Sequence, residues 1–163
     1  MSDLQNFQLA AKSVRKWRDM EIKLLAESGC DDFCYRPSNG MSSYGWLLAH
    51  QAAIYDFSIN MLIEQGPPMN PELFELYRPG TTGEWAGTPL SEVQEYYDAT
   101  EANLLDWVEK ATPTDLDRTI EKGPSFFIGM TNREAITNAF THLNYHTGHL
   151  TALRRDWEKA KSI

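Results

Sequence analysis

The longest proline-free amphipathic stretch of the chain runs from Ile136 to Trp157. It follows Thr131-Asn132-Arg133-Glu134, which has the Thr-x-x-Glu spacing of a capping box at the start of a helix. The pattern predicts that this stretch forms the longest helix of the chain and buries one face. Apolar residues recur in it at steps of three and four, among them Ala139, Leu143, Leu150, Leu153 and Trp157.

Three further stretches have the same periodicity, with helix start and stop signals at their ends. They extend from a capping box at residues 2–5 to near Gly29, from Ser42-Ser43 to Gly66-Pro67-Pro68, and from a capping box at residues 91–94 to an end before Pro113. Four long amphipathic helices, two of them separated by long connections, predict an all-α fold, a four-helix bundle with long crossover connections.

Two connections are rich in proline, glycine and aromatic residues. Residues 67–89 are predicted to form a long crossover loop with one short helix around Pro71 to Leu76, and loops of this length often act as lids or pocket walls. Within residues 112–129, a single helical turn is expected at Thr114–Asp117. The segment Gly123–Ile128 is compatible with a loop, an extended segment or a small hairpin.

Length and composition limit the class of protein. With 163 residues and 42% hydrophobic content, residues 1–163 are predicted to form one domain whose core needs no disulfide bonds. The net charge of −8 and the lack of a basic cluster argue against a nucleic-acid partner. There is no signal-peptide pattern and no apolar run near the roughly 20 residues of a membrane helix, so a cytoplasmic location without a membrane partner is expected.

The two cysteines, Cys30 and Cys34, have a C-x3-C spacing. This is neither the C-x-x-C redox pattern nor half of a paired zinc-ribbon motif. The interpretation that we favour is a pair of structural or incidental thiols, with a redox-labile pair or a sulfur ligand as the alternative.

All four histidines are predicted to lie on helices, and three of them share one helix face. His142, His146 and His149 are separated by steps of four and three, while His50 interrupts the apolar seam of the second helix. Such spacing is typical of metal ligands. Other interpretations stay open: His50 alone suits a buried, hydrogen-bonded histidine, and an H-x3-H pair also occurs at solvated or capping positions.

The segment Ser43-Tyr44-Gly45-Trp46-Leu47-Leu48-Ala49-His50 is followed, about 90 residues later, by His142-x3-His146-x-Gly148 and by Leu153-Arg154-Arg155. This arrangement resembles the DinB/YfiT superfamily over nearly the whole chain. The resemblance implies a four-helix bundle with a divalent metal held by three histidines, one from the second helix and two from the last. Carried over to this sequence, the metal ligands are His50, His142 and His146.

The sequence departs from this family at His149, where glutamine is usual after the glycine. It therefore leaves open whether His149 is a fourth ligand, and we favour a residue that hydrogen-bonds within the site without touching the metal. Characterised relatives activate low-molecular-weight thiols for transfer or isomerisation, and others are described as metal-dependent hydrolases.

Three neutral imidazoles with one open position suit Zn²⁺ or Ni²⁺. The function expected is a metal-dependent enzyme, a thiol S-transferase or hydrolase that acts on a small electrophilic substrate between the second helix, the last helix and the 67–89 loop. No catalytic base is assigned, because Asp56 should face away from His50. The alternative is a non-catalytic stress-response protein with a structural metal.

Two aromatic segments, Phe74–Trp85 and Phe126-Phe127, exceed what a small bundle needs to bury. A homodimer is therefore expected. The other expected partner is a small-molecule substrate, with a low-molecular-weight thiol as one candidate. The aromatic residues near the histidines are predicted to line the core or a pocket; they are Tyr44, Trp46, Trp85 and Tyr145.

Overall fold

The computed structural model describes residues 2–29, 32–37 and 40–162. Within these ranges the regular structure is helical, apart from one isolated antiparallel bridge between Thr119 and Thr131. This confirms the predicted all-α class. The α-helices are α1 (Asp3–Glu27), α2 (Tyr44–Asp56), α3 (Pro71–Tyr77), α4 (Leu90–Lys110), α5 (Pro113–Asp117) and α6 (Asn132–Lys161); a π-helix (Phe57–Ile63) continues α2, and a 3-10 turn covers Ser125–Phe127.

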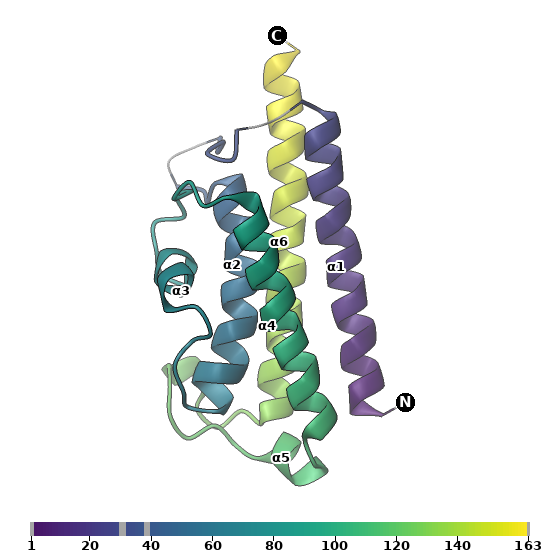
Figure 1. Cartoon of the computed structure of the whole chain (residues 1–163), viewed down its shortest axis with the longest axis vertical. Helices are drawn as coiled ribbons and strands as arrows, with labels where there is room; N and C mark the ends of the chain where they lie inside the picture. Colours follow the sequence, from purple (N-terminus) through teal and green to yellow (C-terminus); the bar gives the residue numbers. More distant parts are fainter. Residues whose placement is uncertain (1, 30–31, 38–39, 163) are drawn as a thin grey trace.

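The four long helices α1, α2, α4 and α6 form the bundle (Figure 1). Helices α1 and α6 run in one direction, and α2 and α4 run in the other (Figure 1). Both α1 and α2 pack against α4 and α6. Because α2 and α4 follow each other among the long helices and are parallel, residues 64–89 have to return along the bundle. The predicted crossover is therefore present, and it carries the predicted short helix, α3.

Helix α2 differs from the predicted amphipathic helix, because all 13 of its residues are buried. One side packs against α4 and α6, and the side that an isolated bundle would expose is covered by α3. The helix thus lacks a polar solvent-facing stripe, as expected for a helix surrounded by protein. The consequence for the site is that His50, in the middle of α2, is removed from bulk water.

The change from α-helix to π-helix occurs at Asp56, which is fully buried. Its carboxylate accepts hydrogen bonds from the Met69 backbone N–H (3.0 Å), the Tyr96 hydroxyl (2.6 Å) and the Asn60 amide (2.7 Å). Buried carboxylates require such partners. Asp56 therefore ties the crossover and α4 to the end of α2.

Two of the three predicted capping boxes are present, at Ser2 and at Thr131. The box predicted at Ser91 is wrong: α4 begins at Leu90, and Pro89, not Ser91, occupies the N-cap, without a side-chain hydrogen bond. A box that the sequence interpretation did not identify lies at Thr112 and Asp115. It starts α5, which includes the predicted turn at Thr114–Asp117.

These caps allow a direct test. Thr131→Ala is expected to lower the free energy of unfolding by about 1 kcal/mol, because the Thr131 hydroxyl accepts the Glu134 N–H at 3.1 Å. Ser91→Ala is the matched control and should change the stability by only a few tenths of a kcal/mol, as is usual for surface substitutions. Urea denaturation measures both, and equal losses in the two variants would contradict the observed helix start.

The 112–131 connection closes on itself beside the end of the π-helix. The Ile120 N–H donates to the Met130 carbonyl (2.8 Å), and the Gly129 N–H donates to the Ile120 carbonyl (2.9 Å). The 3-10 turn Ser125–Phe127 lies between Ile120 and Gly129. The segment is therefore a loop closed by a single β-bridge and, over its described residues, contains no extended strand.

The aromatic residues that led us to expect a homodimer have different surroundings. Phe74 and Tyr77 are buried within the chain itself, whereas Phe126 is 63% exposed. Association through Phe126 stays a prediction. Among the described residues, no helix has the length and apolar character needed to cross a membrane.

Of the two cysteines, Cys34 is exposed and carries a free thiol. Cys30 lies outside the described residues.

Candidate metal centre

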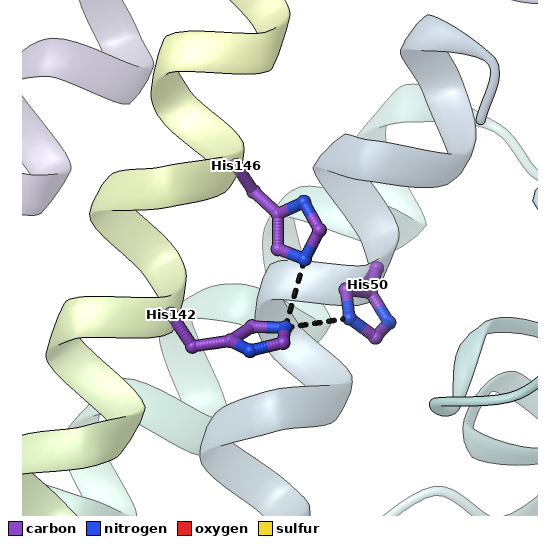
Figure 2. Close-up of side chains that lie close together, drawn as sticks. All are labelled: His50, His142 and His146. Atoms are coloured by element: carbon purple, nitrogen blue, oxygen red, sulfur yellow. Dashed lines mark hydrogen bonds between the residues drawn. The ribbon is translucent and has the colours of Figure 1, made fainter. Parts of the chain in front are cut away.

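Three histidines from two facing helices point toward one another inside the bundle (Figure 2). His50 comes from the middle of α2, and His142 and His146 come from successive turns of α6. The two helices pack against each other, and the four-residue step places both α6 histidines on the face that meets α2. The structure thus brings together the three residues that the family resemblance named as ligands.

The three Nε2 atoms converge. His142 Nε2 lies 3.1 Å from His50 Nε2 and 2.8 Å from His146 Nε2 (Figure 2). One potential ligand nitrogen from each of the three residues lies within 4.8 Å of the other two. A cluster of this size could hold one metal ion, since zinc–nitrogen bonds are about 2.0–2.1 Å long.

The backbone of α3 determines which nitrogen of His50 carries the proton. His50 Nδ1 lies 2.6 Å from the Tyr77 carbonyl oxygen. A carbonyl oxygen only accepts, so Nδ1 donates and Nε2 of the neutral ring presents its lone pair to the cluster. Such an outer hydrogen bond orients a histidine for metal binding.

Burial keeps these rings neutral. Removal from water lowers the pKa of His50 from 6.5 to about 4, and it also lowers the pKa of His142. The pKa of His146 is lowered by burial and further by the neighbouring histidines. Burial disfavours the charged form of an imidazole. Unprotonated nitrogens at neutral pH are what metal binding requires.

The donor set fits a cation better than hydrogen bonding alone. A neutral ring nitrogen carries either a proton or a lone pair, so the single position at His142 Nε2 has to serve two nitrogen neighbours. His146 Nδ1 is buried and has no hydrogen-bond partner among the described residues, so no outer hydrogen bond fixes the proton of this ring as the Tyr77 carbonyl does for His50. A metal ion would accept lone pairs from all three Nε2 atoms.

The Trp46 indole packs against one face of the His50 ring. The two rings are stacked, with centroids 4.1 Å apart and planes at 16°. The Trp46 indole N–H donates to the Thr81 hydroxyl at 2.9 Å, which fixes the indole against the crossover. The sequence interpretation assigned Trp46 to the core or a pocket but missed this contact. The signal was present, because residues four apart on a helix are neighbours.

His149 lies one turn further along α6 and does not join the cluster of converging nitrogens. Its ring packs 4.2 Å from Tyr145 and 5.6 Å from His146, measured between centroids. It is half-buried, so its place is at the rim of the site.

Two cavities approach the histidines along the seam between α2 and α6. The larger, of about 650 Å³, reaches His142 and is mainly apolar; α2 and its π-helix, α3, α6 and residues 124–127 form its walls. The smaller, of about 410 Å³, reaches His146 and His149 from the other side, next to Trp46 and Tyr145. The larger cavity lies between α2, α6 and the crossover, the elements between which the sequence predicted a pocket, and residues 124–127 form an additional wall.

A helical bundle with inward-facing histidines on adjacent helices defines a class of bundles that can carry a metal within the core. The chain belongs to the DinB superfamily, whose family model matches residues 14–150. This confirms the resemblance found in the sequence. A comparison with curated proteins gives no match.

Among solved structures, the chain is similar to a protein described as the conserved protein of locus from Enterococcus faecalis. The similarity covers 91% of this chain and 94% of the other, with a TM-score of 0.66 and 19% sequence identity. At that identity the likeness concerns the fold, and it confirms the bundle with crossovers.

Proposed function

We propose that this protein is a divalent-metal-dependent enzyme in which His50, His142 and His146 hold the ion. The observation that carries the proposal is the convergence of three neutral imidazole nitrogens, one of which belongs to His142 on the wall of an apolar cavity. Imidazole ligands suit Zn²⁺ and Ni²⁺, and three protein ligands are the number typical of catalytic zinc sites. When bound, such an ion lowers the pKa of a water or a thiol toward neutrality.

The residues of the chain would orient the ligands and keep bulk water away. The Tyr77 carbonyl holds the proton of His50 at Nδ1, and the Trp46 indole covers one face of that ring. Beyond His142, apolar side chains such as Phe57, Phe74 and Phe127 would pack against a small substrate. Exclusion of water strengthens electrostatic interactions within a site.

Two reaction classes follow from this arrangement, transfer of a low-molecular-weight thiol to an electrophile and hydrolysis of an ester or amide. The first is favoured by the family resemblance, and the separate cavity next to His146 gives a second molecule a way to approach. Each reaction is assayed with protein loaded with Zn²⁺ or Ni²⁺ and with EDTA-treated protein, so that its dependence on metal is measured. The assay substrates are 1-chloro-2,4-dinitrobenzene with 2-mercaptoethanol and p-nitrophenyl acetate without thiol.

For a transferase, the chloro compound should be converted to the thioether and chloride faster than in its spontaneous reaction with the thiol, and only by the metal-loaded protein. The thiol should also change the absorption spectrum of the cobalt-substituted protein. For a hydrolase, ester turnover should require metal but no thiol, with a rate that rises through the pKa of bound water. Absence of both activities across a broad panel of substrates, with metal bound, would contradict the enzymatic proposal.

The second candidate is a protein whose metal only stabilises the bundle. It is favoured by one observation: the histidine cluster links α2 to α6, so that a bound ion would tie two bundle helices together. This function predicts a lower melting temperature without metal, because a ligand that binds only the folded state stabilises it. It also predicts no catalysis.

A further inference from the structure

One ion pair lies on the wall of the larger cavity. Among the described residues that line this cavity, Glu75 and Arg78 carry formal charge, and both lie at the end of α3. The remaining wall is mainly apolar. A charged group on an apolar wall is the arrangement that fixes the orientation of a small molecule in its site.

Arg78 is held so that part of its guanidinium stays available. Its Nε donates to the Glu75 carboxylate at 2.9 Å and its Nη1 donates to the Pro79 carbonyl at 3.4 Å. Among the described residues, no partner engages Nη2. The Arg78 side chain is 44% exposed, so the guanidinium is accessible at the mouth of the cavity. Arginine presents several donors in a planar fork that matches a carboxylate.

Arg78 is also fixed relative to the histidines. It follows Tyr77, whose carbonyl accepts the His50 Nδ1 proton and whose hydroxyl contacts the Thr88 hydroxyl at 2.6 Å. The cavity therefore has the Arg78 guanidinium and the His142 ring on its walls, and Tyr77 next to Arg78 contacts His50, the neighbour of His142. Asn138, one turn before His142 on α6, is a half-buried amide that also lines the cavity.

We propose that this cavity binds an apolar molecule that carries an anionic group, with the anion held by Arg78 and the apolar body against the phenylalanine side chains. A volume of about 650 Å³ is in the range of small-molecule sites. One part of this proposal rests on the proposed function: the far end of the molecule would face a metal at His142. Recognition of the anion by Arg78 is independent of the proposed function.

An anion fits this cavity better than a cation. Glu75 is 67% exposed and therefore more strongly screened by water than Arg78. An anionic ligand would compete with Glu75 for the guanidinium, so removal of the Glu75 charge should strengthen its binding.

The test is a calorimetric titration with three probes of equal chain length, octanoate, octan-1-ol and octylammonium. Octanoate is expected to bind about tenfold more tightly than octylammonium. Arg78→Gln should weaken octanoate binding about fivefold and leave octan-1-ol unchanged, and Glu75→Gln should strengthen octanoate binding. Phe126→Ala, at an exposed side chain, should weaken octanoate and octan-1-ol alike, because it removes part of the apolar wall.

Arg118→Gln is the matched control. Arg118 is 66% exposed and pairs with Asp115 three residues before it, as Arg78 pairs with Glu75, but it does not line this cavity. This variant should bind octanoate like the unmodified protein. Tighter binding of octylammonium than of octanoate, equal losses in the two arginine variants, or no binding of any probe would overturn the inference.

Titrations of the metal-loaded and the EDTA-treated protein, with metal content measured on the same samples, separate the two proposals. Octanoate selectivity in a protein that binds no metal would uphold the anion site and reject the proposed function. Metal binding without octanoate selectivity would do the reverse.

Discussion

Replacing His146 with alanine will remove most of the divalent metal that the purified protein binds, which we expect at about one ion per chain. The variant loses one of three converging nitrogens, and a site with three protein ligands depends on each of them. The fold should persist, because the change removes the contact of His146 Nε2 with His142 Nε2, and His142 Nε2 keeps His50 Nε2 as a neighbour. Elemental analysis after dialysis measures the metal, and circular dichroism checks the helices.

The matched control is His149→Gln on the same helix. It installs the residue that is usual at this position in the DinB superfamily and should keep the metal content, since His149 lies outside the converging nitrogens. A large loss in His149→Gln would make His149 a ligand. Unchanged metal in His146→Ala would reject the three-histidine site.

Local signals in the sequence predicted most of the helices. The boxes at Ser2 and Thr131 satisfy backbone groups within one turn, so their residues are adjacent in the sequence. The predicted start of α4 was wrong. Ser91 has the right spacing to Gln94 for a capping box, but the helix already begins at Leu90, directly after Pro89. Pattern alone does not distinguish a capping serine from one inside the first turn.

Long-range contacts were beyond such signals. The burial of every residue of α2 depends on α3, which packs over it from the crossover. The π-helix begins where Asp56 binds Tyr96 of α4 and Met69 of the crossover, groups that are far apart in the sequence. Neither feature has a periodicity that the sequence of α2 could reveal.

In the candidate site, too, local sequence predicts some contacts and only the fold reveals the others. The H-x3-H step places His142 and His146 together on any α-helix, so their proximity is a matter of geometry. The pairing with His50 required a known family or the packing of α2 on α6. The Tyr77 contact was invisible, because any residue offers a backbone carbonyl. The anion site at Arg78 is likewise assembled from segments that only the fold brings together.

The buried histidines should also make the metal-free protein sensitive to acid. Burial lowers the pKa of His50 in the folded protein to about 4, whereas the unfolded chain has the ordinary value near 6.5. Above pH 6.5 both states are neutral at this residue. Below it the unfolded chain takes up a proton that the folded chain does not, so stability is lost as the pH falls from 6.5 toward 4.

Between pH 7 and pH 5, His50 alone is expected to cost the EDTA-treated protein about 2 kcal/mol of unfolding free energy, and the lowered pKa values of His142 and His146 add to this loss. Urea denaturation at the two pH values measures this loss, and both values lie above the pKa of an ordinary carboxylate.

His50→Gln removes the titrating ring and leaves an amide that could donate to the Tyr77 carbonyl, so this variant should lose less stability between the two pH values. His149→Gln, at a half-buried position outside the cluster, keeps the His50 ring and should lose more stability than His50→Gln. If His50→Gln keeps the full pH dependence of stability, the buried ring of His50 does not cause that dependence, because the two proteins differ in no other ionisable group.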